Sequence, residues 1–117
     1  MNTGENNRQI YGMNIDDVDR FALSLGEQIT RDQFTKNWFC WRVAGKWFML
    51  TDMAIPEQQV SVKLPLDLAI ELQEQYDSIT PAVHMNKPGW YELYLDYLED
   101  DLVRQLITTS YNLVASA

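Results

Sequence analysis

Residues 38–51 read WFCWRVAGKWFMLT. In an extended chain every second side chain points the same way, and Trp38 to Val43 places large apolar side chains at every second position. Residues 44–46 then form a tight connection into a second extended run, Trp47 to Thr51. This stretch therefore predicts a β-hairpin, and the rest of the fold can be built outward from it.

Two further strands are expected beside the hairpin. Residues 59–64 alternate between apolar and polar side chains, and residues 90–96 do the same. The first of these adjoins the hairpin, which implies an antiparallel meander with one face towards water. The run 78–89 contains two prolines and a glycine. It predicts an irregular connection with at most a short extended piece at 80–83.

The spacing of apolar residues predicts three helices. The first covers 14–25, with Asn14 as its N-cap. The second opens at Pro65 and runs to about Asp77. The third has acidic residues 99–101 in its first turn, where the helix dipole favours negative charge, and its apolar stripe ends at Val114.

The resulting order is helix, three strands, helix, strand, helix. Such an order predicts an α+β fold, in which an antiparallel sheet has helices packed on one face. At 117 residues the chain can bury one core but is too short for two. We expect a loose N-terminal arm at 1–13 and a single domain at 14–117.

Composition limits the classes of partner. The net charge is −8, which disfavours a general attraction to nucleic acids and acidic lipids. No apolar run approaches the roughly 20 residues that cross a bilayer, and no secretory signal opens the chain, so no membrane association is expected. Cys40 is the single cysteine and leaves no intramolecular disulfide. We therefore expect a cytoplasmic protein.

Most enzyme signatures are missing from the sequence. It has no glycine-rich phosphate loop, no Cys and His cluster at metal spacing and no Gly-x-Ser-x-Gly elbow. Cys40 alternates with aromatic residues, as a small buried side chain does. No catalytic residue, metal or cofactor is predicted. The alternative is an enzyme that uses His84 as general acid or base, with Lys63 or Lys87 as electrostatic stabiliser.

An unusual set of polar groups occupies the turn before the last strand. His84, Asn86, Lys87 and Trp90 fall within seven residues, and turns on a rigid scaffold often hold binding groups. The structural alternative is that Asn86 closes the turn and Trp90 fills the core. The binding hypothesis places these residues beside the sheet, where they hold a small anion or a protein partner together with Lys46 and Lys63. It requires Lys63 and Lys87 to share one hollow.

A family resemblance rests on four short matches. Residues 84–90 resemble the His-x-Asn-Lys-x-x-Trp signature of the MmcQ/YjbR family. Residues 43–48 are similar to its Val-Gly-Gly-Lys-x-Phe hairpin, residues 60–63 to its Leu-x-Leu-Lys strand, and residues 110–114 to its Ser-Tyr-x-Leu-Val helix. The matches follow in the right order over roughly 14–114. The resemblance implies a CyaY-like α+β fold with an antiparallel sheet, and no established activity.

The same resemblance implies an alternative function, DNA binding through a double-wing arrangement. Trp38 or Trp47 would then contact bases. The phosphate contacts would come from Arg31, Lys36, Arg42, Lys46 and Lys63. Pro88 and Gly89 stand where the family usually has a basic residue and a histidine, and Ala44 stands where glycine is common. The first departure removes positive charge and weakens the nucleic-acid alternative.

Overall fold

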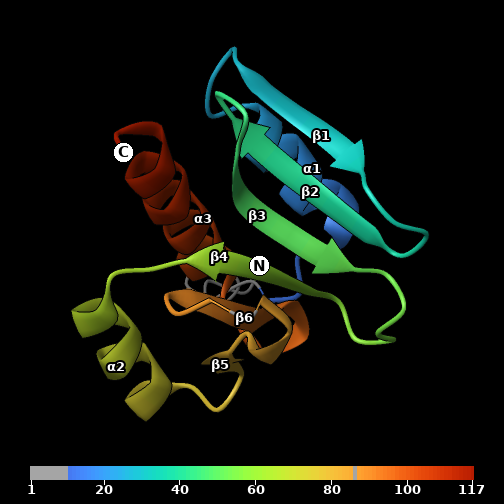
Figure 1. Ribbon diagram of the computed structural model, residues 1–117. Coiled ribbons are helices and arrows are strands. Elements are labelled where there is room, and N and C mark those ends of the chain that lie inside the picture. The colour runs from blue at the N-terminus through green and yellow to red at the C-terminus, as the bar shows by residue number, and fades with distance from the viewer. Residues whose placement is uncertain (1–10, 86) are drawn as a thin grey trace, which may run out of the picture.

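The computed structural model describes residues 11–85 and 87–117, which form an antiparallel sheet of six strands and three α-helices (Figure 1). The strands lie in the order β1-β2-β3-β4-β6-β5. The elements are α1 Ile15–Leu23, β1 Ile29–Gln33, β2 Trp38–Val43, β3 Lys46–Asp52, β4 Gln59–Lys63, α2 Leu66–Gln75, β5 Ile79–Pro81, β6 Trp90–Tyr94 and α3 Asp100–Ala115. Short 3-10 turns, η2 Val83–Met85 and η3 Leu95–Tyr97, flank β6. The expected α+β class is confirmed.

The sheet has one strand that the sequence pattern did not predict. β1 pairs antiparallel with β2, from Ile29 opposite Val43 to Gln33 opposite Phe39. Only Ile29 in β1 is even half-buried, so the strand has no apolar alternation from which it could be predicted. The short extended piece expected at 80–83 is β5, which begins one residue earlier, ends two residues earlier and forms the far edge of the sheet.

The predicted hairpin contains a β-bulge. Trp41 pairs with Met49 while Arg42 pairs with Trp47, which leaves Phe48 as an extra residue in β3. Phe48 and Met49 consequently both enter the main core, whereas Trp47 packs in a second cluster. The bulge therefore turns one tryptophan away from the helices and towards the open face of the sheet.

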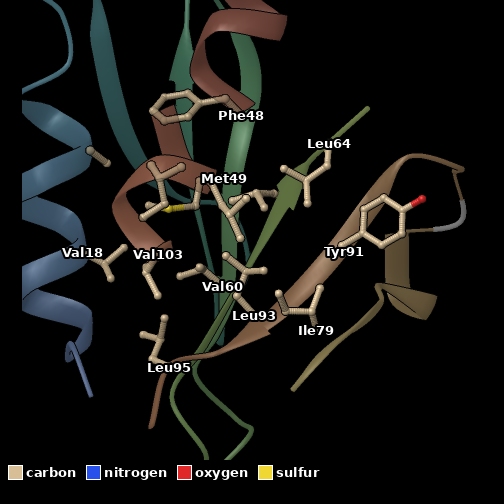
Figure 2. Close-up of a cluster of buried hydrophobic side chains, with 14 of the residues drawn as sticks. Val18, Phe48, Met49, Val60, Leu64, Ile79, Tyr91, Leu93, Leu95 and Val103 are labelled. Atoms are coloured by element: carbon tan, nitrogen blue, oxygen red, sulfur yellow. The ribbon is translucent and has the colours of Figure 1, made fainter. Parts of the chain in front are cut away.

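The main core lies between the sheet and the helices. Figure 2 shows side chains of β3, β4 and β6 meeting Val18 of α1 and Val103 of α3. Ala69 and Leu72 of α2 belong to the same cluster, so all three helices pack on one face, as expected. Met13, in the segment expected as a loose arm, is also buried in this core, while residues 1–10 lie outside the described residues.

Ser110 of α3 joins two strands where their pairing ends. The described register of β3 with β4 has two pairs, Met49 with Val62 and Leu50 with Ser61. Beyond this register the Ser110 hydroxyl donates to the carbonyl oxygen of Phe48 at 2.6 Å and accepts from the N–H of Lys63 at 2.8 Å. A buried hydroxyl thus replaces the missing ladder bonds and fixes the end of β4 that carries Lys63.

The opposite face of the sheet carries a smaller buried cluster. Cys40, Leu50, Ala82 and Trp90 form it, and Trp38, Trp47 and Met85 pack against it. The candidate site lies beside this second cluster.

No helix in the described part of the chain is long and apolar enough to cross a membrane.

Candidate functional site

Three of the lysines singled out in the sequence share one hollow with Trp90. The hollow has a volume of about 480 Å³. We call it the basic hollow, and its functional lining consists of Arg42, Lys46, Trp47, Lys63, Lys87 and Trp90. The spatial requirement of the binding hypothesis, that Lys63 and Lys87 lie together, is therefore met by the geometry.

Strand topology explains why these residues meet. Antiparallel neighbours place the end of one strand beside the start of the next. Arg42 lies near the end of β2, Lys46 begins β3, Lys63 ends β4 and Trp90 begins β6. Lys63 and Trp90 are direct cross-strand partners. Side chains far apart in the sequence thus lie together at one end of four adjacent strands, β2, β3, β4 and β6.

Backbone bonds hold the turn that carries Lys87 against this end of the strands. The N–H of Leu64 donates to the carbonyl oxygen of Gly89 at 3.0 Å, and the N–H of Ala82 donates to that of Trp90 at 2.9 Å. Gly89 has φ 92, a conformation that L side chains rarely adopt. The glycine at this departure from the family signature therefore forms the turn itself.

The side-chain charges of the basic hollow are of one sign. Four cationic side chains line it, and no Asp or Glu of residues 11–85 and 87–117 does, although the chain has 17 acidic residues. Arg42 pairs with Asp32 at 2.6 Å, and the ammonium of Lys46 donates to the backbone oxygen of Ala117 at 3.2 Å. Among residues 11–85 and 87–117, no ion pair involves Lys63 or Lys87. These two exposed ammonium groups carry the uncompensated charge.

The aromatic walls differ in their access to the hollow. Trp90 is only 8% exposed and belongs to the second cluster, which agrees with the structural alternative that it fills a core. Trp47 is half-buried, and its ring lies 5.2 Å from that of Phe34, measured between centroids. Sequence reasoning placed Trp47 only in the nucleic-acid alternative. Its position two residues after the turn was the available signal, while its pairing with Arg42 depends on the bulge.

Two residues of the predicted site are not settled by the structure. Asn86 lies outside the described residues, and His84 belongs to η2 but nothing is described of its side chain. The hypothesis of His84 as acid or base stays untested.

Cys40 is fully buried, and burial raises the pKa of its thiol, an effect that Arg42 only partly opposes. Its environment keeps it protonated, unlike a nucleophilic cysteine.

The nucleic-acid alternative draws on charges that already have partners. The guanidinium of Arg31 pairs with Asp19 at 2.6 Å, and that of Arg42 pairs with Asp32 at the same distance. Lys36 is exposed in the connection between β1 and β2, and it is not part of the basic hollow.

No group of three His, Cys, Asp or Glu that could hold a metal occurs among the described residues.

Comparison with known proteins identifies relatives over most of the chain. The YjbR family model matches residues 23–113. The "Uncharacterized protein YbdF" of Escherichia coli O157:H7 is 34% identical over 74 residues, which are 62% of this chain and 61% of that protein. The "Uncharacterized protein YjbR" of Escherichia coli K12 is 38% identical over 53 residues, 44% of this chain and 45% of that protein. The chain thus matches less than two thirds of either relative.

Solved structures share the fold. The crystal structure of Deinococcus radiodurans protein DR2400, with the domain DUF419, superposes with a TM-score of 0.81 at 24% identity, covering 92% of this chain and 82% of that one. A Pseudomonas syringae protein superposes with a TM-score of 0.72 at 21% identity, covering 87% of this chain and 99% of that one. The family resemblance of the sequence is confirmed, and the chain belongs to the YjbR family.

Proposed function

We propose that this YjbR-family domain is a non-enzymatic binding module that holds a small organic anion in the basic hollow. The observation that carries the proposal is that four cationic side chains converge in the hollow on a chain of net charge −8, and that two of them, Lys63 and Lys87, have no ion pair among the described residues. Like charges repel, so such a cluster is favourable when an anion occupies it. Lys63 and Lys87 would make the charge contacts.

The walls suggest the chemistry of the rest of the ligand. Trp47 offers a half-buried ring at the side of the hollow, and apolar atoms of Met85 and Val114 line it as well. Planar or apolar groups pack on such a surface, while ammonium groups bind phosphate or carboxylate as point charges. The volume lies within the usual range of small-molecule sites, about 300–1,000 Å³. A phosphate- or carboxylate-bearing compound with a flat moiety fits best.

The location of the protein forms part of the proposal. Cys40 is a free, buried thiol with no disulfide partner. Disulfides are rare in the cytoplasm, and a free thiol agrees with that compartment. We propose that the binding event takes place there.

A thermal-shift experiment tests the proposal. Inorganic phosphate, pyrophosphate and a set of nucleoside monophosphates and aromatic carboxylates are added to the wild type. A ligand at 100 times its dissociation constant adds about 2.7 kcal/mol to stability. We expect Lys63→Ala and Lys87→Ala to lose the shift, while Lys36→Ala, an exposed lysine outside the hollow, keeps it. An equal shift in all four proteins would contradict the proposal.

The DNA-binding alternative predicts a different outcome. Labelled duplex and single-stranded DNA would bind with an affinity that falls steeply as salt is raised, because phosphate contacts release counterions. Arg31→Ala and Lys36→Ala would then weaken binding as much as Lys63→Ala does. We expect no such binding at low salt, since Arg31 and Arg42 are paired with carboxylates.

A further inference from the structure

A second hollow lies at the other end of β6. The basic hollow meets β6 at Trp90, whereas this one meets it at Tyr94. Its volume is about 490 Å³. We call it the tyrosine hollow, and its lining consists of Gln75, Tyr76, Asp77, Ser78, Tyr94 and Tyr97. It plays no part in the proposed anion site.

Backbone bonds fix the walls of the tyrosine hollow. The N–H of Tyr94 donates to the carbonyl oxygen of Ser78 at 3.0 Å, which ties the end of β6 to the segment after α2. Tyr76 caps α2 through a 2.8 Å bond to Leu72, and its ring packs against the main core. Tyr97, in η3, leaves 67% of its surface exposed. The backbone of Tyr76 and of Tyr94 is thus held in place, while Tyr97 lines the hollow and stays largely exposed.

The electrostatic character of this hollow is opposite to that of the basic hollow. Its lining contains the carboxylate of Asp77, and no Lys or Arg of the described residues lines it. The Tyr94 hydroxyl donates to Oε1 of Glu92 at 3.3 Å, and Glu92 is only 5% exposed. Burial raises the pKa of Tyr94, and the charges of Glu92 and Glu57 raise it further. The phenol therefore stays neutral, while carboxylates stand close to it.

We propose that the tyrosine hollow binds a small quaternary ammonium cation through the rings of Tyr76, Tyr94 and Tyr97 and the carboxylate of Asp77. Aromatic faces carry negative potential and attract cations, most strongly when the cation sheds its water easily. A trimethylammonium group is weakly hydrated and has an apolar surface that matches the largely apolar lining. An anion would find no cationic partner among the lining residues of this hollow.

Choline and its uncharged isostere 3,3-dimethylbutan-1-ol provide the test. The two compounds have the same shape and differ in charge, so the pair separates cation binding from simple apolar packing. Titrations of the full chain are followed through the tyrosine ring resonances by NMR. We expect saturable binding of choline, at least about tenfold tighter than that of the isostere. Each tyrosine ring and the carboxylate attract the positive charge, and each adds part of the binding free energy that separates the two compounds.

Variants of the lining assign the binding to this hollow. Tyr97→Ala should weaken choline binding about fivefold, Tyr97→Phe should keep it, and Asp77→Asn should weaken it about two- to fivefold. Leu66→Ala removes an equally exposed side chain, 66% against 67%, outside the hollow and should change nothing.

Equal binding of the isostere, no saturable choline binding, or unchanged affinity in both Tyr97→Ala and Asp77→Asn would overturn the proposal. If Tyr97→Ala does not fold, Asp77→Asn and the isostere decide. The basic hollow is untouched by these variants, so failure here leaves the proposed anion site as it stands.

Discussion

Ser110 is the residue on which the position of Lys63 depends. Its hydroxyl is fully buried and satisfies both the carbonyl of Phe48 and the N–H of Lys63. Ser110→Ala leaves the buried carbonyl of Phe48 and the part-buried N–H of Lys63 without this partner, and an unsatisfied buried group typically costs about 1–3 kcal/mol. We expect a loss of this size in the free energy of urea unfolding. A loss below about 0.5 kcal/mol, the scale of surface substitutions, would show that the bridge contributes little.

Tyr94 gives the protein a specific sensitivity to high pH. Burial and the neighbouring Glu92 raise its pKa above the usual 10.0, so the folded state holds this proton more tightly than the unfolded state. The corresponding stability is present below about pH 10 and is lost as pH rises through the folded pKa. We expect the wild type to lose stability above about pH 10 more steeply than Tyr94→Phe in urea unfolding at several pH values. Parallel curves would contradict this assignment.

Single residues also show where sequence reasoning reaches its limit. Ser110 was visible only as part of a family resemblance, because a serine in a helix gives no sign that its hydroxyl will join two strands. Trp47 alternates as a strand residue should, but the bulge at Phe48 decides which face it occupies. Such register effects depend on both strands together, and no single run of sequence contains them.

At the scale of elements, burial separates the strands that could be predicted from those that could not. Four strands contain several buried residues each and were all expected from their apolar side chains: β2, β3, β4 and β6. β1 is almost entirely exposed. It is stabilised by pairing with β2 and by the ion pair of Arg31 with Asp19, neither of which leaves a periodic pattern.

The connection between α1 and β1 packs closely against α3. A Cβ added at Gly26 would overlap the hydroxyl of Tyr111, whose ring also makes an edge contact with Phe48 at 5.5 Å between centroids. We expect Gly26→Ala to cost about 1–3 kcal/mol in chemical denaturation, the usual range for overpacking.

The double variant tests the cause of that loss. Tyr111→Phe removes the atom that blocks the added methyl group, so the pair should be less destabilised than the sum of the two single changes, with a coupling of about 0.5 kcal/mol or more. Strict additivity would mean that the backbone shifts and Tyr111 is not the obstacle.

At the scale of the whole molecule, the two hollows lie at opposite ends of β6 and have opposite charge. The basic hollow could be anticipated in part, because Lys46, Lys63 and Lys87 were grouped as polar residues of connections and of the exposed strand face. The gathering of strand ends that brings them together follows from the strand order in the structure. The wall of this hollow at Val114 and Ala117 could not be anticipated, since no pattern tells where the end of α3 will lie against the sheet. The tyrosine hollow was missed because its rings fit equally well as core-facing helix and strand positions.

The central claim is that Lys46, Lys63 and Lys87 surround one anion. NMR signals of the lysine ε-methylene groups, followed while pyrophosphate or the ligand found by thermal shift is added, test it most directly. We predict that these three lysines shift along one saturation curve with a single dissociation constant, while Lys36, exposed and outside the hollow, does not move. Shifts of equal size in all four lysines, or separate curves for Lys63 and Lys87, would contradict the account.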